Sequence, residues 1–340
     1  MTTAITIGMI IIYVAIMMGI GVYTARQTRS VSDFVLGSHS VGSWLTAFAY
    51  GTSYFSAVVF IGYAGQFGWT YGVSAAWVGV GNALLGSLLA WIVLGRRTRI
   101  MTQSLGAKTM PEYFEKRWNS KGLKIAAALI VFVFLIPYTA SVYNGLSRLF
   151  NMAFQIESEG AYKIIIIVMA LLTAIYVILG GYAATAINDF IQGIIMLFGI
   201  CAVILAVLNS QGGFLAALEG LSQVSDPAVS SAPGVFASFF GPDPANLLGV
   251  VLLTSLGTWG LPQMVQKFYA IKSEKSIDAG TVISTLFALV VAGGCYFLGG
   301  FGRLFAGQME VVNGVPVGGY DVVIPTMLSG LPDLLMAVVV

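Results

Sequence analysis

The chain has 340 residues, of which 58% are hydrophobic and only 9% are charged. Because a soluble domain carries about a quarter charged residues, this composition excludes a globular soluble enzyme and indicates a protein that crosses a membrane several times. The net charge of +2, without a basic run interleaved with aromatic residues, gives no sign of nucleic-acid binding.

Runs of about 20 apolar residues, the length that crosses the hydrocarbon core, predict eight membrane spans and the start of a ninth. In chain order they are 4–24, 44–67, 72–94, 124–149, 161–182, 188–208, 246–267 and 279–303, with the ninth beginning near Pro325. No basic region precedes the first run, and it is long enough for a permanent span rather than a cleaved signal peptide. The chain is still apolar at Val340, so we expect it to be the N-terminal portion of a longer protein.

The basic residues predict the orientation. Most of the Lys and Arg residues follow the first, third and seventh spans, whereas Arg148, Lys163 and Arg303 fall on the other side. The segment 209–245 contains acidic residues but no Lys or Arg. Since loops rich in Lys and Arg stay in the cytoplasm, we expect a multi-pass protein of the plasma or inner membrane with its N-terminus outside.

Two of the predicted spans carry polar or helix-breaking residues in their centres. Residues 50–57 place glycine, hydroxyls and a phenol inside one apolar run, and residues 254–262 interrupt another about 200 residues later. Non-helical backbone is tolerated at membrane depth only where it lines a protein-enclosed or watery cavity. Interrupted spans in both halves of a chain are typical of the central binding site of a secondary transporter. No phosphate-binding glycine loop or nucleophile elbow is present, so we do not expect an enzyme.

Five segments resemble the sodium:solute symporter family. Residues 33–42 are similar to its F-x-L-G-G-R-S-L-G loop, 51–56 to its interrupted core helix, and 110–117 to L-P-x-Y-F-x-x-R. Residues 176–192 resemble Y-x-x-x-G-G-x-x-A followed by D-x-x-Q, and 260–268 resemble G-x-P-x-x-x-x-R-F. One such match would be weak evidence, but five in order and at the family spacing are specific.

The resemblance implies an all-α, LeuT-type fold, a five-plus-five inverted repeat preceded by one extra helix. Residues 1–43 would form the extra N-terminal helix and a cytoplasmic loop, and 44–208 the first repeat, whose first helix is interrupted. Residues 209–245 would form an extracellular loop. Residues 246–340 would begin a second repeat that is truncated in this chain: an interrupted helix, one full helix and the start of a third.

The resemblance also implies sodium (Na+) as the coupling ion. Sodium is a hard cation that takes oxygen ligands, and unwound backbone supplies carbonyls without burying a charge. By the family pattern these would be the carbonyls of Thr52 and Phe55, with hydroxyl partners beyond Val340, and Asp189 would lie on the sodium pathway. Two alternatives stay open: residues 51–56 form a helix-packing patch of small residues, or Asp189 caps the helix that follows it.

Solute contacts in the family come from both interrupted helices and from the fourth predicted span. On this chain the matching candidates are Ser53, Ser56, Ala57, Tyr138, Asn144, Thr254, Thr258 and Trp259. An interhelical hydrogen bond or ordinary aromatic packing remains an alternative for each of them. Asn82 is a lone amide in the third span, and the sequence assigns it no role.

The chain departs from the proline branch of the family at two positions. Tyr54 stands where that branch has an aspartate, and His39 stands where it has an arginine, which puts proline itself in doubt as the solute. We therefore expect symport of a small organic solute (an amino acid, carboxylate, vitamin or sugar) with sodium across a lipid bilayer. A symporter-like membrane sensor domain and a proton-coupled transporter are the alternatives.

Overall fold

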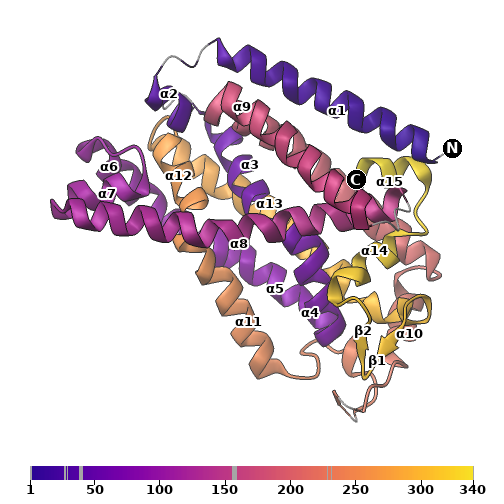
Figure 1. Ribbon diagram of the computed structural model, residues 1–340. Coiled ribbons are helices and arrows are strands. Elements are labelled where there is room, and N and C mark those ends of the chain that lie inside the picture. Colours follow the sequence, from indigo (N-terminus) through magenta and orange to yellow (C-terminus); the bar gives the residue numbers. More distant parts are fainter. Residues whose placement is uncertain are drawn as a thin grey trace.

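The structure is a computed structural model that describes residues 2–26, 28, 30–37, 41–154, 159–227, 229–230 and 232–339, so His39 lies outside the described residues. Helices form nearly all of its regular structure, and the described residues contain one two-stranded sheet (Figure 1). Helix α1 (Thr2–Ala25) covers the first predicted span. Short helix α2 (Val31–Leu36) follows, and its first turn is held by a capping box between Ser30 and Asp33.

The second predicted span is divided by a break. Helix α3 (Ser43–Tyr54) stops at Phe55, and the chain resumes as a π-helical turn, η2 (Val58–Tyr63), that continues into α4 (Ala64–Tyr71). The chain then turns at Gly72, where φ is +64° and a Cβ would lie 2.0 Å from the Phe236 carbonyl oxygen. Only glycine accommodates both the backbone angle and that approach.

The third predicted span follows this turn and leads into the basic segment that begins at Arg96. Its elements are η3 (Gly72–Ala75), α5 (Ala76–Gly81), η4 (Asn82–Leu88), η5 (Trp91–Gly95) and α6 (Arg96–Leu105). Helix α7 (Met110–Trp118) lies beside the start of α8 (Lys121–Phe154), which carries Pro137 in its interior. The large apolar side chains of α8 include Phe132 and Phe134, which are 67% and 68% exposed, as expected of a surface that faces lipid or other helices.

Helix α9 (Glu159–Ser210) contains a kink at Gly181, where φ is 57° and ψ is −150°. At 1.5 Å per residue a straight helix of that length would span about twice a 30 Å hydrocarbon core, so the kink separates two crossings. They correspond to the predicted spans 161–182 and 188–208. A Cβ at Gly181 would lie 2.8 Å from the Phe34 carbonyl oxygen, so the kink also lets α2 approach.

The second interrupted span is bent rather than straight. Helix α10 (Phe214–Ser222) and η6 (Val235–Ala237) precede it. The span itself consists of α11 (Pro244–Leu256), η7 (Gly257–Gly260) and α12 (Pro262–Ala270), with an angle of 53° between its two parts. Pro262 begins α12, where a missing N–H costs no intrahelical hydrogen bond.

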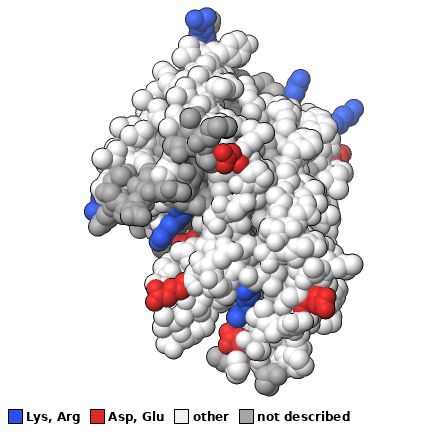
Figure 2. Space-filling view, turned by 90° about the vertical axis from the view of Figure 1, so that its right-hand side faces the viewer, with Lys and Arg blue, Asp and Glu red and all other residues white. Residues whose placement is uncertain are grey.

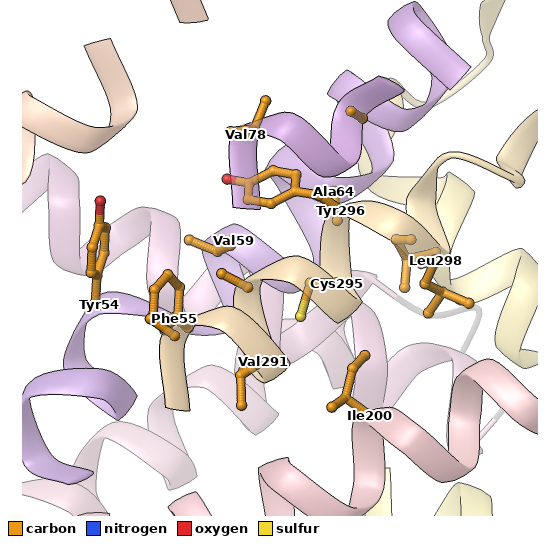
Figure 3. Packing of buried hydrophobic residues seen from close by; sticks show 14 of the residues in the cluster. Tyr54, Phe55, Val59, Ala64, Val78, Ile200, Val291, Cys295, Tyr296 and Leu298 are labelled. Carbon is orange, nitrogen blue, oxygen red and sulfur yellow. The ribbon is translucent and has the colours of Figure 1, made fainter. Parts of the chain in front are cut away.

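Helix α13 (Lys275–Gly299) runs through the centre of the bundle and contacts both halves (Figure 1). Its buried side chains, including Val291, Cys295 and Tyr296, pack against residues of the first interrupted helix and of α9 (Figure 3). Cys295 is a buried free thiol, and Cys201 is free and exposed.

The last part of the chain differs from the prediction. Helix α13 ends at Gly299 rather than near Arg303, and the predicted ninth span is divided. The elements there are η8 (Gly302–Gln308), β1 (Val311–Val312), β2 (Val315–Pro316), η9 (Tyr320–Val322), α14 (Val323–Leu328) and α15 (Asp333–Val339). Gly330 and Pro332 lie between α14 and α15, and a proline cannot donate the backbone bond that would continue α14.

The described residues contain five helices that are long and apolar enough to cross a membrane, or six if α11 and α12 form one span. Most of the surface in Figure 2 carries no charge. We call the end of the bundle with α6, α7 and the start of α8 the basic end, and the end with the β1–β2 hairpin, α10 and α14 the hairpin end (Figure 1).

Arg303 holds several loops together at the hairpin end. Its Nε donates to the Trp69 carbonyl oxygen (2.6 Å), its Nη1 donates to the Asp226 carboxylate (3.0 Å), and its guanidinium lies 3.9 Å from the Phe236 ring centroid. Burial lowers the pKa of Arg303 from its ordinary value, while Asp226 opposes that shift. An arginine keeps its proton under such conditions, so a charged pair holds these loops together at the hairpin end.

Candidate functional site

The first break leaves backbone carbonyls without their helical partners. The Phe55 N–H still donates to the Gly51 carbonyl (2.9 Å), but the next bond, from the Ser56 N–H to the Thr52 carbonyl, is absent from this described segment. The amides of Val59 and Phe60 both donate to the Ser56 carbonyl (2.9 and 3.1 Å), which bypasses that of Phe55. Thr52 and Phe55, whose carbonyls the family pattern assigns to sodium, therefore both lie at this break.

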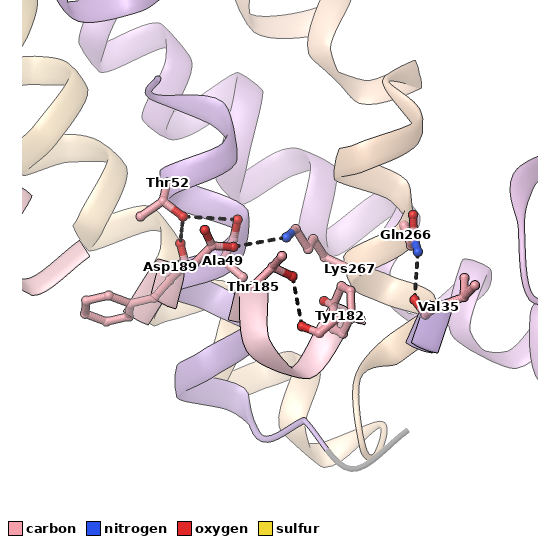
Figure 4. Close-up of polar contacts among 9 residues, drawn as sticks. Val35, Ala49, Thr52, Tyr182, Thr185, Asp189, Gln266 and Lys267 are labelled. Atoms are coloured by element: carbon pink, nitrogen blue, oxygen red, sulfur yellow. Dashed lines mark hydrogen bonds and ion pairs between the residues drawn. The ribbon is translucent and has the colours of Figure 1, made fainter. Parts of the chain in front are cut away.

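The side chain of Thr52 lies at this break, near Asp189 on α9. Its hydroxyl lies on the side of α3 that faces the Asp189 carboxylate (Figure 4), and it donates to the Phe48 carbonyl oxygen at 2.9 Å. Backbone, hydroxyl and carboxylate oxygens therefore occur in the same region of the bundle. Oxygen donors of this kind suit an alkali cation.

Asp189 also forms an ion pair that the sequence did not predict. The Nζ of Lys267 on α12 lies 3.4 Å from the Asp189 Oδ2, and the two side chains are only 8% and 19% exposed. The ammonium also lies 5.2 Å from the centroid of the Tyr182 ring. Lys267 stands at the end of the predicted span 246–267, and α12 continues past it to Ala270 and buries it.

This ion pair lies toward the basic end. Helix α12 ends at Ala270, and the residues that follow it lie at the basic end. There the Lys272 N–H donates to the Val41 carbonyl (3.0 Å), and Arg99 donates to the Lys272 carbonyl (3.1 Å). The Gln266 side chain donates to the Val35 carbonyl (2.8 Å; Figure 4). The polar contacts between α2, α6 and α12 therefore hold the bundle closed between the break and the basic end.

The two interrupted helices are joined directly. The Tyr54 hydroxyl donates to the Thr254 carbonyl (2.9 Å), across 200 positions of sequence, and it also lies within reach of the Thr258 side chain. The Asn82 Oδ1 accepts from the hydroxyls of Thr254 (3.0 Å) and Ser255 (3.1 Å). Asn82 was given no role from the sequence, and in the structure it binds the second interrupted helix.

The predicted solute contacts divide into two groups. Around the breaks lie Ser53, Ser56, Ala57, Thr254 and Thr258, all of them partly or fully buried, together with Trp259, whose indole N–H donates to the Leu85 carbonyl (2.9 Å). Asn144 on α8 lies farther out, where its Oδ1 accepts from the Tyr162 hydroxyl (2.7 Å). Tyr138 is half-buried, and among the described residues its side chain has no hydrogen bond and lines neither cavity.

Two cavities open from the break toward the hairpin end. The smaller, about 250 Å³, lies between the segment after the break (Val58, Gly62, Tyr63) and Asn144 on α8. The larger, about 390 Å³, is lined by Arg148 and Asn151 of α8 and by Gln308 and Thr326. Asp321 lines both cavities. No group of three or more His, Cys, Asp or Glu side chains suited to a metal ion occurs within the described ranges.

A helical membrane bundle in which two interrupted helices contact each other is an architecture typical of secondary transporters. The sequence model of the "Sodium:solute symporter family" matches residues 34–340. The chain belongs to the sodium:solute symporter family.

Named relatives agree with this assignment. The chain is 34% identical over 276 residues to the sodium/proline symporters of Staphylococcus aureus strains JH9 and NCTC 8325, an alignment that covers 79% of this chain and 50% of each relative. The chain thus spans about half the length of the curated relatives it matches. Its fold resembles that of a Na+-coupled sialic acid symporter in a substrate-bound outward-open state, with a TM-score of 0.72 at 14% identity, covering 98% of this chain and 69% of that one.

These findings confirm the predicted family and the all-α, LeuT-type fold of a multi-pass membrane protein. Members of the family are transporters rather than enzymes, in agreement with the sequence prediction. Four residues of the site region were missed from the sequence: Tyr54 as a link between the breaks, Asn82, Lys267 and Asp321. A basic residue at the edge of an interrupted span and an amide inside an apolar span were the available signals, because polar groups at membrane depth are expensive to bury.

Proposed function

We propose that this chain forms part of a symporter that couples the inward movement of sodium to that of a small organic solute by alternating access. The observation that carries the proposal is the first break, where the Thr52–Ser56 helical hydrogen bond is missing and the Asp189 carboxylate of α9 lies close to Thr52 (Figure 4). Carbonyl oxygens can replace the hydration shell of a cation without adding charge to the site.

In this proposal Asp189 lies on the sodium pathway and Lys267 neutralises it when sodium is elsewhere. A buried carboxylate without a partner is costly, and a buried pair avoids that cost. Sodium that approaches Asp189 competes with the Lys267 ammonium for the same oxygens. The ion pair between α9 and α12 would then weaken as sodium leaves the break, which opens the route toward the basic end.

The direct link between the breaks supplies a route for coupling. Sodium bound at Thr52 and Phe55 fixes the backbone at the end of α3. The Tyr54 side chain is then held in place, and its hydroxyl keeps the hydrogen bond to the Thr254 carbonyl of the second interrupted helix. Solute bound between the two helices would benefit from the same arrangement. Two ligands promote each other's binding only to the extent that both prefer the same conformation, and the Tyr54 contact belongs to one such conformation.

The solute contacts that we propose come from both breaks: Ser53, Ser56 and Ala57 from the first, and Thr254, Thr258 and Trp259 from the second, with Asn144 on α8. Tyr138, a half-buried side chain without a hydrogen bond to the described residues, is left out of this proposed set. The named sodium/proline relatives favour a small amino or imino acid among the possible solutes. Tyr54 stands where we expect an aspartate in the proline branch, so proline is one member of a test panel rather than the assumed solute.

The orientation that we propose places the basic end in the cytoplasm and the N-terminus outside, in the plasma or inner membrane. Arg96, Arg97, Lys116 and Arg117 all lie on α6 or α7 at that end, and the positive-inside rule assigns such segments to the cytoplasm. The two cavities then face the exterior, and the Asp189–Lys267 pair lies between the break and the cytoplasm.

Uptake by the full-length protein in proteoliposomes tests the proposal. Radiolabelled amino acids, monocarboxylates, pantothenate and sugars would be offered with an inward sodium gradient, an inward proton gradient or neither. We expect sodium-dependent accumulation of one solute class, abolished by Ser56→Leu. The exposed, distant Arg97→Met is the matched control and should transport normally. Uptake that follows the proton gradient alone, or no uptake of any solute, would refute sodium symport.

A further inference from the structure

The larger cavity is lined by Arg148, which has no hydrogen-bond or ion-pair partner among the described residues. The Nε of Arg148 is buried and makes no hydrogen bond, and Arg148 takes part in none of the ion pairs between described residues. The Oδ1 of Asn151, one turn further along α8, is also buried without a donor. Because buried polar groups are nearly always satisfied, two such groups in the wall of one cavity indicate a place for a polar ligand.

Asp321 provides the opposite charge on the other wall. Its carboxylate has one weak contact from the Asn144 amide, at 3.4 Å, and it is not paired with Arg148, although both line the same cavity. At about 390 Å³ the cavity is within the range of small-molecule sites. A separated cation and anion facing one space match a ligand that carries both charges.

The order of the two charges along the path gives the ligand a direction. Asp321 lines the smaller cavity, which touches Val58 and Gly62 directly after the first break, whereas Arg148 lines only the larger cavity farther from it. A zwitterion held by both residues would therefore point its ammonium group toward the break and its carboxylate away from it. Arginine binds carboxylates through two parallel N–H donors, and one of these hydrogen bonds would come from the Nε of Arg148.

We propose that Arg148 and Asp321 select a zwitterionic solute, an α-amino or α-imino acid, on its way to the break. Arg148 binds the carboxylate and Asp321 the ammonium. Solutes that lack either group lose one of the two contacts and leave a half-buried charged residue without its partner. The proposal rests on the proposed function and deepens it, because it names the solute class and the residues that choose it.

Equilibrium binding to the full-length protein in detergent tests this selection without requiring transport. Twenty radiolabelled amino acids identify the best ligand, and two unlabelled analogues of it then compete: the methyl ester, which lacks the carboxylate, and the N-acetyl derivative, which lacks the ammonium. In the natural protein we expect each analogue to bind roughly tenfold or more weakly than the parent, as for the loss of one charge-assisted hydrogen bond.

The variants should give a crossed pattern. Arg148→Met should remove the discrimination against the ester and keep that against the N-acetyl derivative, and Asp321→Asn should do the reverse. Thr326→Val, in the same cavity but uncharged, and Arg97→Met, which removes a charge at the basic end, should both discriminate like the natural protein. Arg148→Gln and Asp321→Ala repeat the test if a first variant does not fold as a monodisperse protein.

Several results would overturn the proposal. If the Arg148 and Asp321 variants both still bind the methyl ester and the N-acetyl derivative more weakly than the parent amino acid, other residues bind the charged groups of the solute. Binding of none of the twenty amino acids would exclude the zwitterion class, even if sodium-dependent uptake of a sugar or carboxylate upheld the proposed function. Conversely, the crossed pattern with no sodium-driven uptake would uphold the selection and refute sodium symport.

Discussion

The basic end and the hairpin end of the bundle treat buried charge differently. At the basic end Asp189 and Lys267 are paired 3.4 Å apart, and Gln266 and Arg99 bond to backbone carbonyls that close the surrounding turns. At the hairpin end Arg303 is paired with Asp226, but Arg148 faces a cavity without a partner. Arg99 also has two buried nitrogens, Nε and Nη1, without a hydrogen bond among the described residues, but it lines neither cavity, whereas Arg148 lines the larger one.

This contrast suggests how the chain divides its work. The paired side chains can hold the basic end shut without any ligand, since opening it would expose or separate a buried ion pair. The cavities at the hairpin end need no rearrangement to admit a small molecule. The first break lies between the two ends, with the smaller cavity on one side of it and the Asp189–Lys267 pair on the other. Four changes test this division, from the largest expected effect to the smallest.

Asp189→Asn should have the largest effect, because it leaves the Lys267 ammonium buried without its counter-charge. Breaking a buried pair costs about 3 kcal/mol of unfolding free energy or more. We expect a clear fall in the melting temperature of the detergent-solubilised protein and a loss of sodium-dependent stabilisation. The double variant Asp189→Asn, Lys267→Met should recover most of the melting temperature but not the response to sodium.

A single Asp189→Asn variant as stable as the natural protein would contradict the closed, desolvated pair at the basic end. Recovery of the sodium response in the double variant would contradict the assignment of Asp189 to the sodium pathway. The two readings are independent because one concerns stability without sodium and the other concerns the change on adding it.

Arg303→Met tests the hairpin end. It removes the hydrogen bond to the Trp69 carbonyl and the cation facing Asp226. Because the Arg303 and Asp226 side chains are only 7% and 15% exposed, we expect a loss of stability of about 3 kcal/mol, close to that of Asp189→Asn. Sodium binding, measured by the ligand-induced shift in melting temperature, should remain unchanged. Arg97→Met is the control for the loss of an exposed arginine. An altered sodium response would show that the two ends are not separable.

Tyr54→Phe tests the link between the ends. The lost hydroxyl bond to the Thr254 carbonyl corresponds to about 1 kcal/mol, or roughly a fivefold weaker enhancement of solute binding by sodium. Tyr50→Phe is a matched control, since the Tyr50 hydroxyl also donates to a carbonyl, that of Gly86 (3.1 Å), without joining the breaks. Equal effects of the two changes would mean that Tyr54 has no special part in coupling.

Tyr138→Phe should have the smallest effect. The side chain is half-buried on α8 and lines neither cavity, so we expect solute binding within about twofold of the natural protein, as for a surface change away from any contact. Equilibrium binding of the best amino acid measures it. A loss as large as that of Ser56→Leu would restore Tyr138 to the proposed solute site.

Much of the helical layout could be predicted from the sequence, because the thickness of the hydrocarbon core imposes the length of each apolar run. The break near residues 50–57 was also predictable, since glycine, hydroxyls and a phenol in the centre of such a run favour an interrupted helix. The final predicted span was the exception: it is mostly apolar, but Gly330 and Pro332 divide it between α14 and α15. Hydropathy records burial rather than helix continuity.

The sequence by itself determined which residues could be placed in a membrane and where the backbone must open. Only the tertiary structure decided which distant polar groups meet: Lys267 with Asp189 across 78 positions, Arg303 with Asp226 across 77, and Tyr54 with Thr254 across 200. A buried polar group must find a partner, but its own sequence position does not say which one. That choice follows from how the helices cross, and it is the choice on which the proposed function depends.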